Sequence, residues 1–341
     1  MTPPHPLVDL PGIQSLRERV EKRLMAAVES DDPTMAAMAS HLVKAGGKRL
    51  RPLLGALSSI TGRAVGLPGR TGERPLGDTV SDDAVTGGVA CELVHVGSLH
   101  HDDVIDEATT RHNVDSVNIR WGNLRAILSG DFLLARASEL AASLGTEVAA
   151  LLASTISRLC EGEVRELEHA YRLDRTEDDY TAAIEGKTAA LYSTTCHIGG
   201  LVAGLERDHV DGLAEFGRSY GMAFQVVDDI LDVVATDAEL GKPAGHDMAE
   251  GVYNLPVLRT FAGRGGDELR ALLGGPLDET HRARALDIVR AGDGVAEAAD
   301  TARGYVGDAL AALDRLPPSP ASEALASATH HLVASLDGRV A

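Results

Sequence analysis

Aromatic residues, cysteines and long apolar runs are all scarce in this chain. Only 3% of its 341 residues are aromatic, and its three cysteines are isolated and lack CxxC spacing. Such cysteines argue against a disulfide framework or a zinc knuckle and favour a reducing compartment. No apolar window approaches the roughly 20 residues of a membrane span, and the proline-rich start shows no signal-peptide pattern. We therefore expect a cytoplasmic protein without a membrane span and with a flexible N-terminal tail over about residues 1–11.

Basic residues are in the minority. Acids outnumber bases by 51 to 32, which gives a formal net charge of −19. Because nucleic-acid phosphates need a basic surface, we expect no nucleic-acid partner. The excess of acids suits a metal ion or another cationic partner better.

The dominant pattern in the sequence is helical. Alanine, leucine and arginine are abundant, and apolar residues recur three and four positions apart, as in amphipathic helices. Ser81, Thr176 and Ser319 can cap helix N-termini, and no alternating stretch is long enough for a strand. We predict an all-α fold with helices near 12–30, 35–45, 50–61, 81–107, 122–143, 146–171, 177–205, 209–236, 252–262, 278–291, 294–314 and 320–337.

Residues 61–83 interrupt this pattern. The segment holds five glycines and two prolines, so we predict a glycine-rich surface loop over about residues 62–81. The chain before it is too short for a robust core of its own. We therefore expect a single domain over residues 1–341.

Two acidic clusters share the spelling DDxxD. They comprise Asp102, Asp103 and Asp106 in LHHDDVIDEATTRHN, and Asp228, Asp229 and Asp232 in FQVVDDILDV. Residues four apart share a helix face, so the first and last carboxylates of each cluster repel one another unless a cation lies between them. One such cluster is equally compatible with a solvated helix end, but the second is embedded in apolar sequence, where unpaired carboxylates are costly. Oxygen ligands without nearby cysteines favour Mg²⁺ shared with substrate phosphates.

Basic residues suited to a diphosphate lie in a turn upstream. The stretch AGGKRLRP places Lys48, Arg49 and Arg51 directly after a glycine pair and at the start of a helix. Taken alone, this motif is also what a basic surface turn looks like. His95 lies about two helical turns before Asp102 and therefore on nearly the same face, although a lone helical histidine is more often a packed or surface residue.

Further charged residues follow each acidic cluster. Arg111 comes after the first cluster, and Lys187 lies in GKTAAL. After the second cluster, GKPAGHDMAEG brings Lys242, His246 and Asp247 into a glycine-broken loop. A mobile flap over phosphates needs such a loop, but an ordinary connection explains it equally well.

Taken together, these motifs resemble the trans-prenyl diphosphate synthases, the family of farnesyl, geranylgeranyl and longer polyprenyl diphosphate synthases. The resemblance covers about residues 44–256 and keeps the family's order of GGKRLRP, HDDVID, GKTA, FQVVDDILD and GKPAGHD. It implies a single bundle of antiparallel helices around a deep central cavity, usually in a homodimer. It also implies a Mg²⁺-dependent prenyltransferase that joins isopentenyl diphosphate to an allylic diphosphate, yielding a longer all-trans polyprenyl diphosphate and pyrophosphate.

The resemblance implies a role for each motif. The catalytic groups would be Lys187 and the six aspartates of the two clusters. The six aspartates would hold three Mg²⁺ ions. The allylic diphosphate would contact Arg111, Lys187, Thr188, Gln225 and Lys242. Isopentenyl diphosphate would contact Lys48, Arg51, His95 and His112. No protein nucleophile is needed, because the allylic diphosphate ionises, the double bond attacks the cation, and the departed pyrophosphate takes the proton.

The chain departs from the family pattern at His112 and Asn113. The family usually has a second arginine and then a glycine at these positions, and a neutral imidazole is a weaker phosphate partner than a guanidinium. We predict that Lys48, Arg51 and His95 carry the binding of isopentenyl diphosphate.

Small residues before the first cluster bear on product length. Ser98 lies one turn before Asp102, with Gly97 beside it and Val94 a further turn away. In short-chain members of the family, bulky side chains near these positions close the pocket. We therefore expect a medium-to-long product; a large side chain from another helix would instead close the tunnel and make the chain a farnesyl or geranylgeranyl diphosphate synthase.

Three other classes of protein remain as alternatives. A terpene cyclase, or an enzyme of the squalene or phytoene synthase type, would share the acidic motifs but has no evident use for GGKRLRP. A non-catalytic partner subunit would be expected to have eroded acidic motifs, and both are intact. A helical metal-binding or scaffolding protein explains the acids but not the basic turn.

Overall fold

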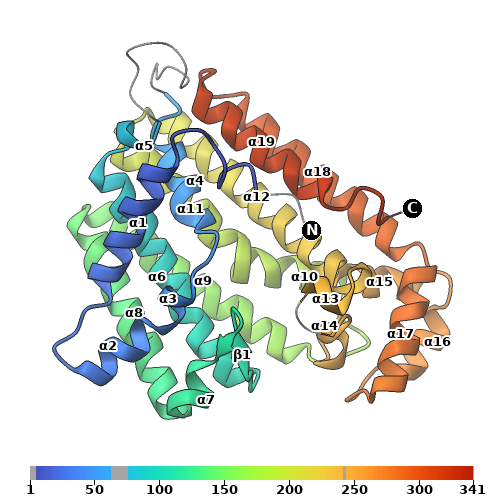
Figure 1. The fold of residues 1–341 in the computed structure, drawn as a ribbon. Coiled ribbons are helices and arrows are strands. Elements are labelled where there is room, and N and C mark those ends of the chain that lie inside the picture. Colours follow the sequence, from blue (N-terminus) through green and yellow to red (C-terminus); the bar gives the residue numbers. More distant parts are fainter. Residues whose placement is uncertain (1–4, 63–75, 241–242, 341) are drawn as a thin grey trace.

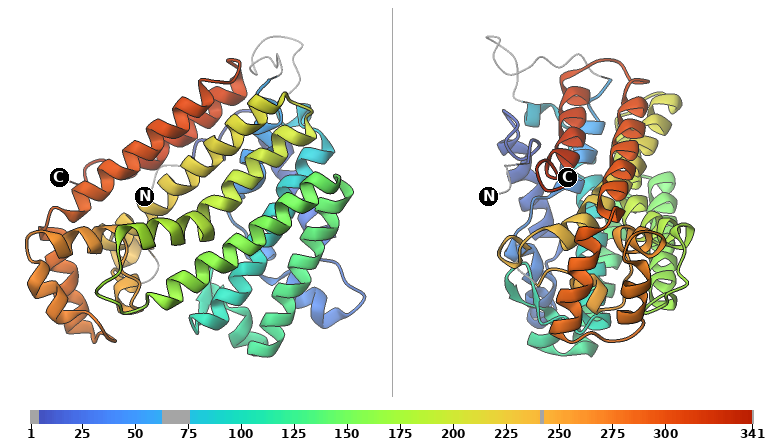
Figure 2. Two further views of the ribbon diagram at one scale, coloured as in Figure 1. Left: turned by 180° about the vertical axis from the view of Figure 1, so that it is seen from behind. Right: turned by 90° about the vertical axis from the view of Figure 1, so that its right-hand side faces the viewer.

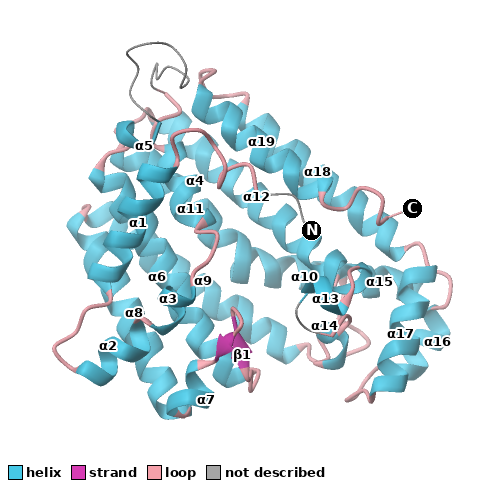
Figure 3. Cartoon of the chain, in the orientation of Figure 1, coloured by secondary structure: helices cyan, strands magenta, loops and turns pink. Residues whose placement is uncertain are grey.

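The computed structural model describes residues 5–62, 76–240 and 243–340, which form an all-α bundle (Figures 1 and 3). Its long helices are α1 (Gln14–Ala27), α6 (Asp82–Ile105), α8 (Asn123–Ser143), α9 (Thr146–Glu168), α11 (Ala190–Val202), α12 (Arg207–Val234), α17 (Glu279–Ala291), α18 (Gly294–Leu313) and α19 (Pro320–Ala334). The shorter helices are α2 (Pro33–Ala39), α3 (His41–Ala45), α4 (Leu50–Ser58), α5 (Leu76–Thr79), α7 (Val117–Trp121), α10 (Glu177–Ile184), α13 (Asp237–Leu240), α14 (His246–Ala249), α15 (Leu255–Ala262) and α16 (Gly266–Leu272). A π-helix, η1 (Glu185–Ala189), joins α10 to α11, and β1 (Thr110–Arg111) pairs with β2 (Val114–Asp115) in an antiparallel hairpin.

The predicted helix caps are confirmed. The side chain of Ser81 accepts a hydrogen bond from the backbone N–H of Ala84 at the start of α6. Thr176 forms a capping box with Asp179 at the start of α10, and Ser319 forms one at the start of α19. Each cap satisfies backbone donors that the first turn of a helix leaves unpaired.

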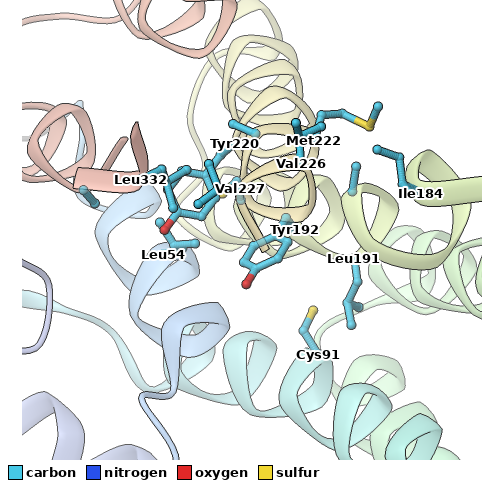
Figure 4. Packing of buried hydrophobic residues seen from close by; sticks show 14 of the residues in the cluster. Leu54, Cys91, Ile184, Leu191, Tyr192, Tyr220, Met222, Val226, Val227 and Leu332 are labelled. Carbon is cyan, nitrogen blue, oxygen red and sulfur yellow. The ribbon is translucent and has the colours of Figure 1, made fainter. Parts of the chain in front are cut away.

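The helices form one continuous core. In Figure 2, seen from behind, α8, α9, α11, α12 and α18 lie side by side in that order, each in contact with the next. The helix α6 lies inside this arrangement and packs on α4, α8 and α11. Figure 4 shows Tyr192, Tyr220 and Leu54 among the buried side chains where α11, α12 and α4 meet. Both helices that carry DDxxD motifs are therefore fixed by packing along their length.

The structure differs from the sequence prediction in several segments. The predicted helix over 177–205 is interrupted by η1, and the hairpin β1–β2 was not predicted because two residues per strand are too few to show alternation. The short helices α5, α7, α13, α14 and α16 also lack a predicted counterpart of their own. Within the N-terminal segment over about residues 1–11, for which a flexible tail was predicted, the side chains of His5 and Leu7 are buried. Residues 63–75 of the predicted glycine-rich loop lie outside the described residues.

No helix in the described part of the chain combines the length and the apolar character needed to cross a membrane.

Candidate active site

A cavity of about 600 Å³ lies between the C-terminal ends of α6 and α12. Asp102 and Asp106 line it from α6, and Asp228 lines it from α12. Lys187 and Arg111 contribute positive charge to the same wall. The structure therefore brings together the two acidic clusters and two of the bases that the sequence singled out.

The three aspartates of the first cluster face different surroundings. Asp102 is half-buried and Asp106 is exposed, both at the cavity, whereas Asp103 is fully buried. The carboxylate of Asp103 accepts a hydrogen bond from Nε of Arg111 at 2.8 Å, and Nη2 of the same guanidinium lies 2.8 Å from the same oxygen in an ion pair. Asp103 therefore anchors the β1–β2 hairpin, and Arg111 with it, beside the cavity.

The second cluster divides in a similar way. Asp228 is exposed at the cavity, while Asp229 and Asp232 are buried. Asp229 lines the cavity and accepts hydrogen bonds from the Tyr180 hydroxyl at 2.6 Å and from Nε2 of Gln225 at 2.8 Å. Asp232 accepts one from the backbone N–H of Asp247 at 3.3 Å, which ties α12 to α14.

The predicted contact residues Thr188 and Gln225 are joined to this cluster. The Thr188 hydroxyl donates to Oε1 of Gln225 at 2.8 Å, and Gln225 donates in turn to Asp229. These two hydrogen bonds orient the side-chain amide of Gln225 so that its nitrogen points toward Asp229. Tyr180 was not identified from the sequence, since a single tyrosine on an amphipathic helix has the pattern of an ordinary core residue.

Lys187 lies in the π-helix η1 and is held by two glutamates of α9. Its Nζ lies 2.8 Å from Glu163 and 2.5 Å from Glu166. Burial opposes the charge, but the two carboxylates raise the pKa of Lys187 well above its usual value, so the side chain stays protonated. Neither glutamate is predicted from the sequence, although their spacing of three residues on α9 puts them on one face.

A close helix crossing places Lys187. A Cβ added to Gly186 would meet the backbone oxygen of Arg158 at 2.7 Å, and one added to Gly162 would meet the backbone nitrogen of Lys187 at 2.5 Å. The backbones of α9 and η1 therefore approach more closely than residues with side chains would allow. A π-helix inserts an extra residue into a turn and often occurs at functional sites.

Among the described residues that line the cavity, carboxylate side chains outnumber arginine and lysine side chains by eight to three. Burial, together with the nearby Glu163 and Asp106, raises the pKa of Asp102 to about 7 against the opposing effect of Lys187 and Arg111. Asp106 is exposed as a whole residue, but desolvation of its carboxylate by the surrounding wall raises its pKa as well, against the effect of Lys187. Among the described residues, no three ligand-type side chains converge into a ready-made metal cage. Oxygen donors that need a counter-charge yet leave coordination positions for another ligand fit Mg²⁺.

A second group of basic residues lies beside the first cluster, and of its members only Arg111 also lines the cavity. Arg51, His112, Arg111 and Arg49 all act electrostatically on His95. Burial first, and these cations second, hold the pKa of His95 well below its usual range, so the imidazole is neutral. The guanidinium of Arg51 lies 4.6 Å from the centre of the Tyr192 ring. The positive charge of Arg51 and Arg111 would favour an anion beside His95.

Four further residues were singled out from the sequence, and two of them line the cavity. Lys48 is exposed on the turn before α4, and Lys242 lies outside the described residues. His246 lines the cavity from α14, where its Nε2 lies 3.0 Å from Glu250. Asp247 lines the cavity as well.

The residues assigned to product length do not share one environment. A Cβ on Gly97 would meet the backbone oxygen of Gly130 at 3.2 Å and the Cβ of Leu133 at 3.3 Å, so Gly97 faces α8. Val94 is fully buried, and Ser98 is half-buried. Of the three residues, Ser98 is the one that is not buried, so it is the position that has room for a larger side chain.

Comparison with known proteins gives a consistent result. Residues 32–289 match the family model described as Polyprenyl synthetase. The chain is 36% identical over 318 residues to the nonaprenyl diphosphate synthase of Mycobacterium tuberculosis, covering 92% of this chain and 91% of that protein. The crystal structure of the heptaprenyl diphosphate synthase from Staphylococcus aureus superposes with a TM-score of 0.85 at 28% identity, covering 94% and 98% of the two chains.

A third relative was crystallised with ligands. The geranylgeranyl pyrophosphate synthase of Corynebacterium glutamicum, complexed with calcium and isoprenyl diphosphate, superposes with a TM-score of 0.79 at 37% identity. The match covers 94% of this chain and 95% of that one. Relatives with products of different length are thus similarly close to this chain in sequence.

Proposed function

Because this chain belongs to the polyprenyl synthetase family, we propose that it condenses isopentenyl diphosphate with an allylic diphosphate to give a longer all-trans polyprenyl diphosphate and pyrophosphate. The observation that carries the proposal is the single cavity lined by Asp102 and Asp106 from one helix and Asp228 from another, with Lys187 in its wall. A diphosphate leaving group needs this combination of counter-ions and cationic donors.

The allylic diphosphate binds in the cavity. Lys187 and Arg111 donate to its oxygens, with Thr188 and Gln225 beside them, and Lys242 belongs to the same predicted set. Asp102, Asp106 and Asp228, with other members of the two clusters, would hold Mg²⁺, and the resemblance implies three ions. When bound, the metal neutralises the diphosphate and makes it a better leaving group. Asp103 acts through Arg111, whose guanidinium it fixes at 2.8 Å.

Isopentenyl diphosphate binds at the basic group beside α6. Lys48, Arg51 and His95 hold its diphosphate, with His112 at the edge of the site. A neutral His95 can donate one N–H to a phosphate oxygen without adding charge. The protein supplies position and counter-charge, and the departing pyrophosphate accepts the proton lost from the product.

The product is proposed to be of medium to long chain. The support is the small side chain of Ser98 one turn before Asp102, together with the nonaprenyl and heptaprenyl synthases among the relatives. A shorter product is the alternative, because a geranylgeranyl pyrophosphate synthase is also among the relatives. The basic group beside α6 speaks against a terpene cyclase, which has no second diphosphate to bind.

A homodimer is the proposed assembly. Several large apolar side chains are exposed on α7 and α8: Ile119 at 55%, Leu124 at 80% and Leu128 at 58% of full exposure. Apolar side chains gathered on one face favour burial against a second copy of the chain. The free cysteines fit the proposed cytoplasmic location, where thiols stay reduced.

The direct test is incubation of the purified chain alone with Mg²⁺, labelled isopentenyl diphosphate and a series of allylic diphosphates, followed by sizing of the products. Elongated linear prenyl diphosphates support the proposal. Cyclic hydrocarbons would identify a cyclase, and activity only after addition of a second protein would identify a partner subunit.

A further inference from the structure

Arg49 occupies an unusual backbone conformation in the turn between α3 and α4. Its φ and ψ are 52° and 40°, in the left-handed region, and it follows Gly46 and Gly47, whose φ angles are 94° and 152°. A left-handed conformation costs a residue with a side chain roughly 1–2 kcal/mol. Interactions elsewhere must therefore hold Arg49 in place.

The side chain of Arg49 supplies those interactions. It is 2% exposed, and each of its three nitrogens donates a hydrogen bond. Nε donates to Glu21 of α1 at 2.8 Å, Nη1 to Glu92 of α6 at 3.2 Å, and Nη2 to the backbone oxygen of Val43 in α3 at 2.7 Å. The guanidinium thus ties three helices to one turn and points into the protein, although the sequence suggested a base available to phosphate.

The position of Glu92 connects these hydrogen bonds to Lys48, Arg51 and His95, the proposed contacts of isopentenyl diphosphate. Glu92 is buried, with 4% of its surface exposed, and lies three residues before His95 on α6. Lys48 and Arg51 flank Arg49 in the turn, so the bond between Arg49 and Glu92 sets how the turn lies against the helix that carries His95. Three of the proposed isopentenyl diphosphate contacts are thereby held in register by one buried ion pair.

We propose that Arg49 and Glu92 are positioning residues for the isopentenyl diphosphate site: their buried ion pair fixes the turn of Lys48 and Arg51 against His95, and Arg49 does not itself contact substrate. This inference rests on the proposed function and names residues that act within that site through others.

The alternative is that Arg49 leaves Glu92 and binds the diphosphate directly. The two roles predict opposite effects of Glu92→Gln. If Arg49 binds substrate, the Glu92 carboxylate competes with the diphosphate for its guanidinium. Neutralising that carboxylate then frees the guanidinium and strengthens substrate binding. If Arg49 positions the turn, the same change loosens the turn and weakens binding, even though it removes a negative charge close to the cationic group and would by charge alone favour an anion.

The test is direct binding of isopentenyl diphosphate to the full chain with Mg²⁺ and without an allylic substrate, measured by calorimetry. We expect Glu92→Gln and Arg49→Asn each to raise the dissociation constant about tenfold, while the KM for the allylic diphosphate changes less than about twofold. Asparagine adopts the left-handed conformation readily, so Arg49→Asn removes the side-chain bonds without straining the backbone. Glu147→Gln, in an exposed ion pair with Arg207, is the matched control and should leave both constants unchanged.

Three results would overturn the inference. Tighter binding by Glu92→Gln would assign Arg49 to substrate. If both variants bound isopentenyl diphosphate as tightly as the parent, the ion pair would have no positioning role. If the dissociation constant for isopentenyl diphosphate and the KM for the allylic diphosphate rose equally, the ion pair would serve only the general stability of the fold. A parent chain that binds no isopentenyl diphosphate would instead overturn the proposed function itself, and the binding measurement separates that case because it needs no turnover.

Discussion

Asp103 and Arg111 form a two-nitrogen ion pair at 2.8 Å, with the carboxylate fully buried and the guanidinium reaching the cavity wall. The middle aspartate of the first DDxxD motif thus holds a base at the cavity wall, where we propose that the allylic diphosphate binds.

This pairing predicts the effect of Asp103→Asn. The change leaves Arg111 without its charged partner, so we expect the KM for the allylic diphosphate to rise about tenfold and the free energy of unfolding to fall by roughly 1–3 kcal/mol. Steady-state kinetics and urea denaturation measure the two effects. Asp174→Asn, which breaks the exposed pair with Arg172, is the control and should leave the stability close to that of the parent chain. Unaltered allylic KM in Asp103→Asn would exclude the anchoring role.

The crossing of α9 and η1 predicts a second effect. Gly186→Ala places a Cβ against backbone, which cannot yield by a side-chain rotation, so we expect a loss of stability of roughly 1–3 kcal/mol. Because Lys187 follows directly, the allylic KM should rise as well. Gly304→Ala on α18, where a Cβ meets nothing within 4 Å, is the control and should stabilise the protein by about 0.5–1 kcal/mol. A Gly186→Ala variant as stable as the parent would show that the crossing tolerates a methyl group.

His112 gives a third prediction. It is exposed, lies at φ 51°, and has Arg111 and Arg49 close enough to act on it electrostatically. Desolvation of the ring by its neighbours first, and these two cations second, lower the pKa of His112, so its imidazole adds little charge. With Lys48, Arg51 and His95 carrying the diphosphate, His112→Arg should change turnover at saturating isopentenyl diphosphate by less than about threefold. A large gain in turnover would mean that Lys48, Arg51 and His95 do not make up for the arginine that the family usually has at this position.

Product length supplies a fourth prediction. Ser98→Phe places a ring one turn before Asp102, and we expect shorter products because the growing chain meets it earlier. Chromatographic sizing of the products measures this. Gly97→Ala is the comparison, since its methyl group faces Gly130 and Leu133 of α8 and should affect stability while leaving product length alone. An unchanged product distribution in Ser98→Phe would locate the floor of the tunnel elsewhere.

Local chemistry explains which parts of the fold could be read from the sequence. Ser81, Thr176 and Ser319 cap the helices that they were predicted to cap, because a cap depends on residues within one turn. Spacing by four also placed Asp102 and Asp106 on one face of α6 at the cavity. These features depend on neighbours along the chain.

Contacts between distant segments explain the rest. Nothing in the local sequence separates Arg49 from Lys48 and Arg51, yet Glu21 and Glu92 turn Arg49 inward. The π-helix at Lys187 interrupts a stretch with good helical periodicity, because α9 crosses it at a pair of glycines. The role of Tyr180 likewise depends on Asp229, 49 residues away.

The central claim is that carboxylates from two separate helices act together on one diphosphate. The most direct measurement is the rate of elongated product formation from isopentenyl diphosphate and an allylic diphosphate, in the parent chain, in Asp102→Asn and in Asp228→Asn, with Mg²⁺ and after its chelation. We predict that the parent loses its activity on chelation and recovers it with added Mg²⁺, and that each variant is slowed by about a hundredfold or more, since each removes charge that stabilises the departing diphosphate. Full activity in either variant, or elongation that continues without a divalent metal, would contradict the account.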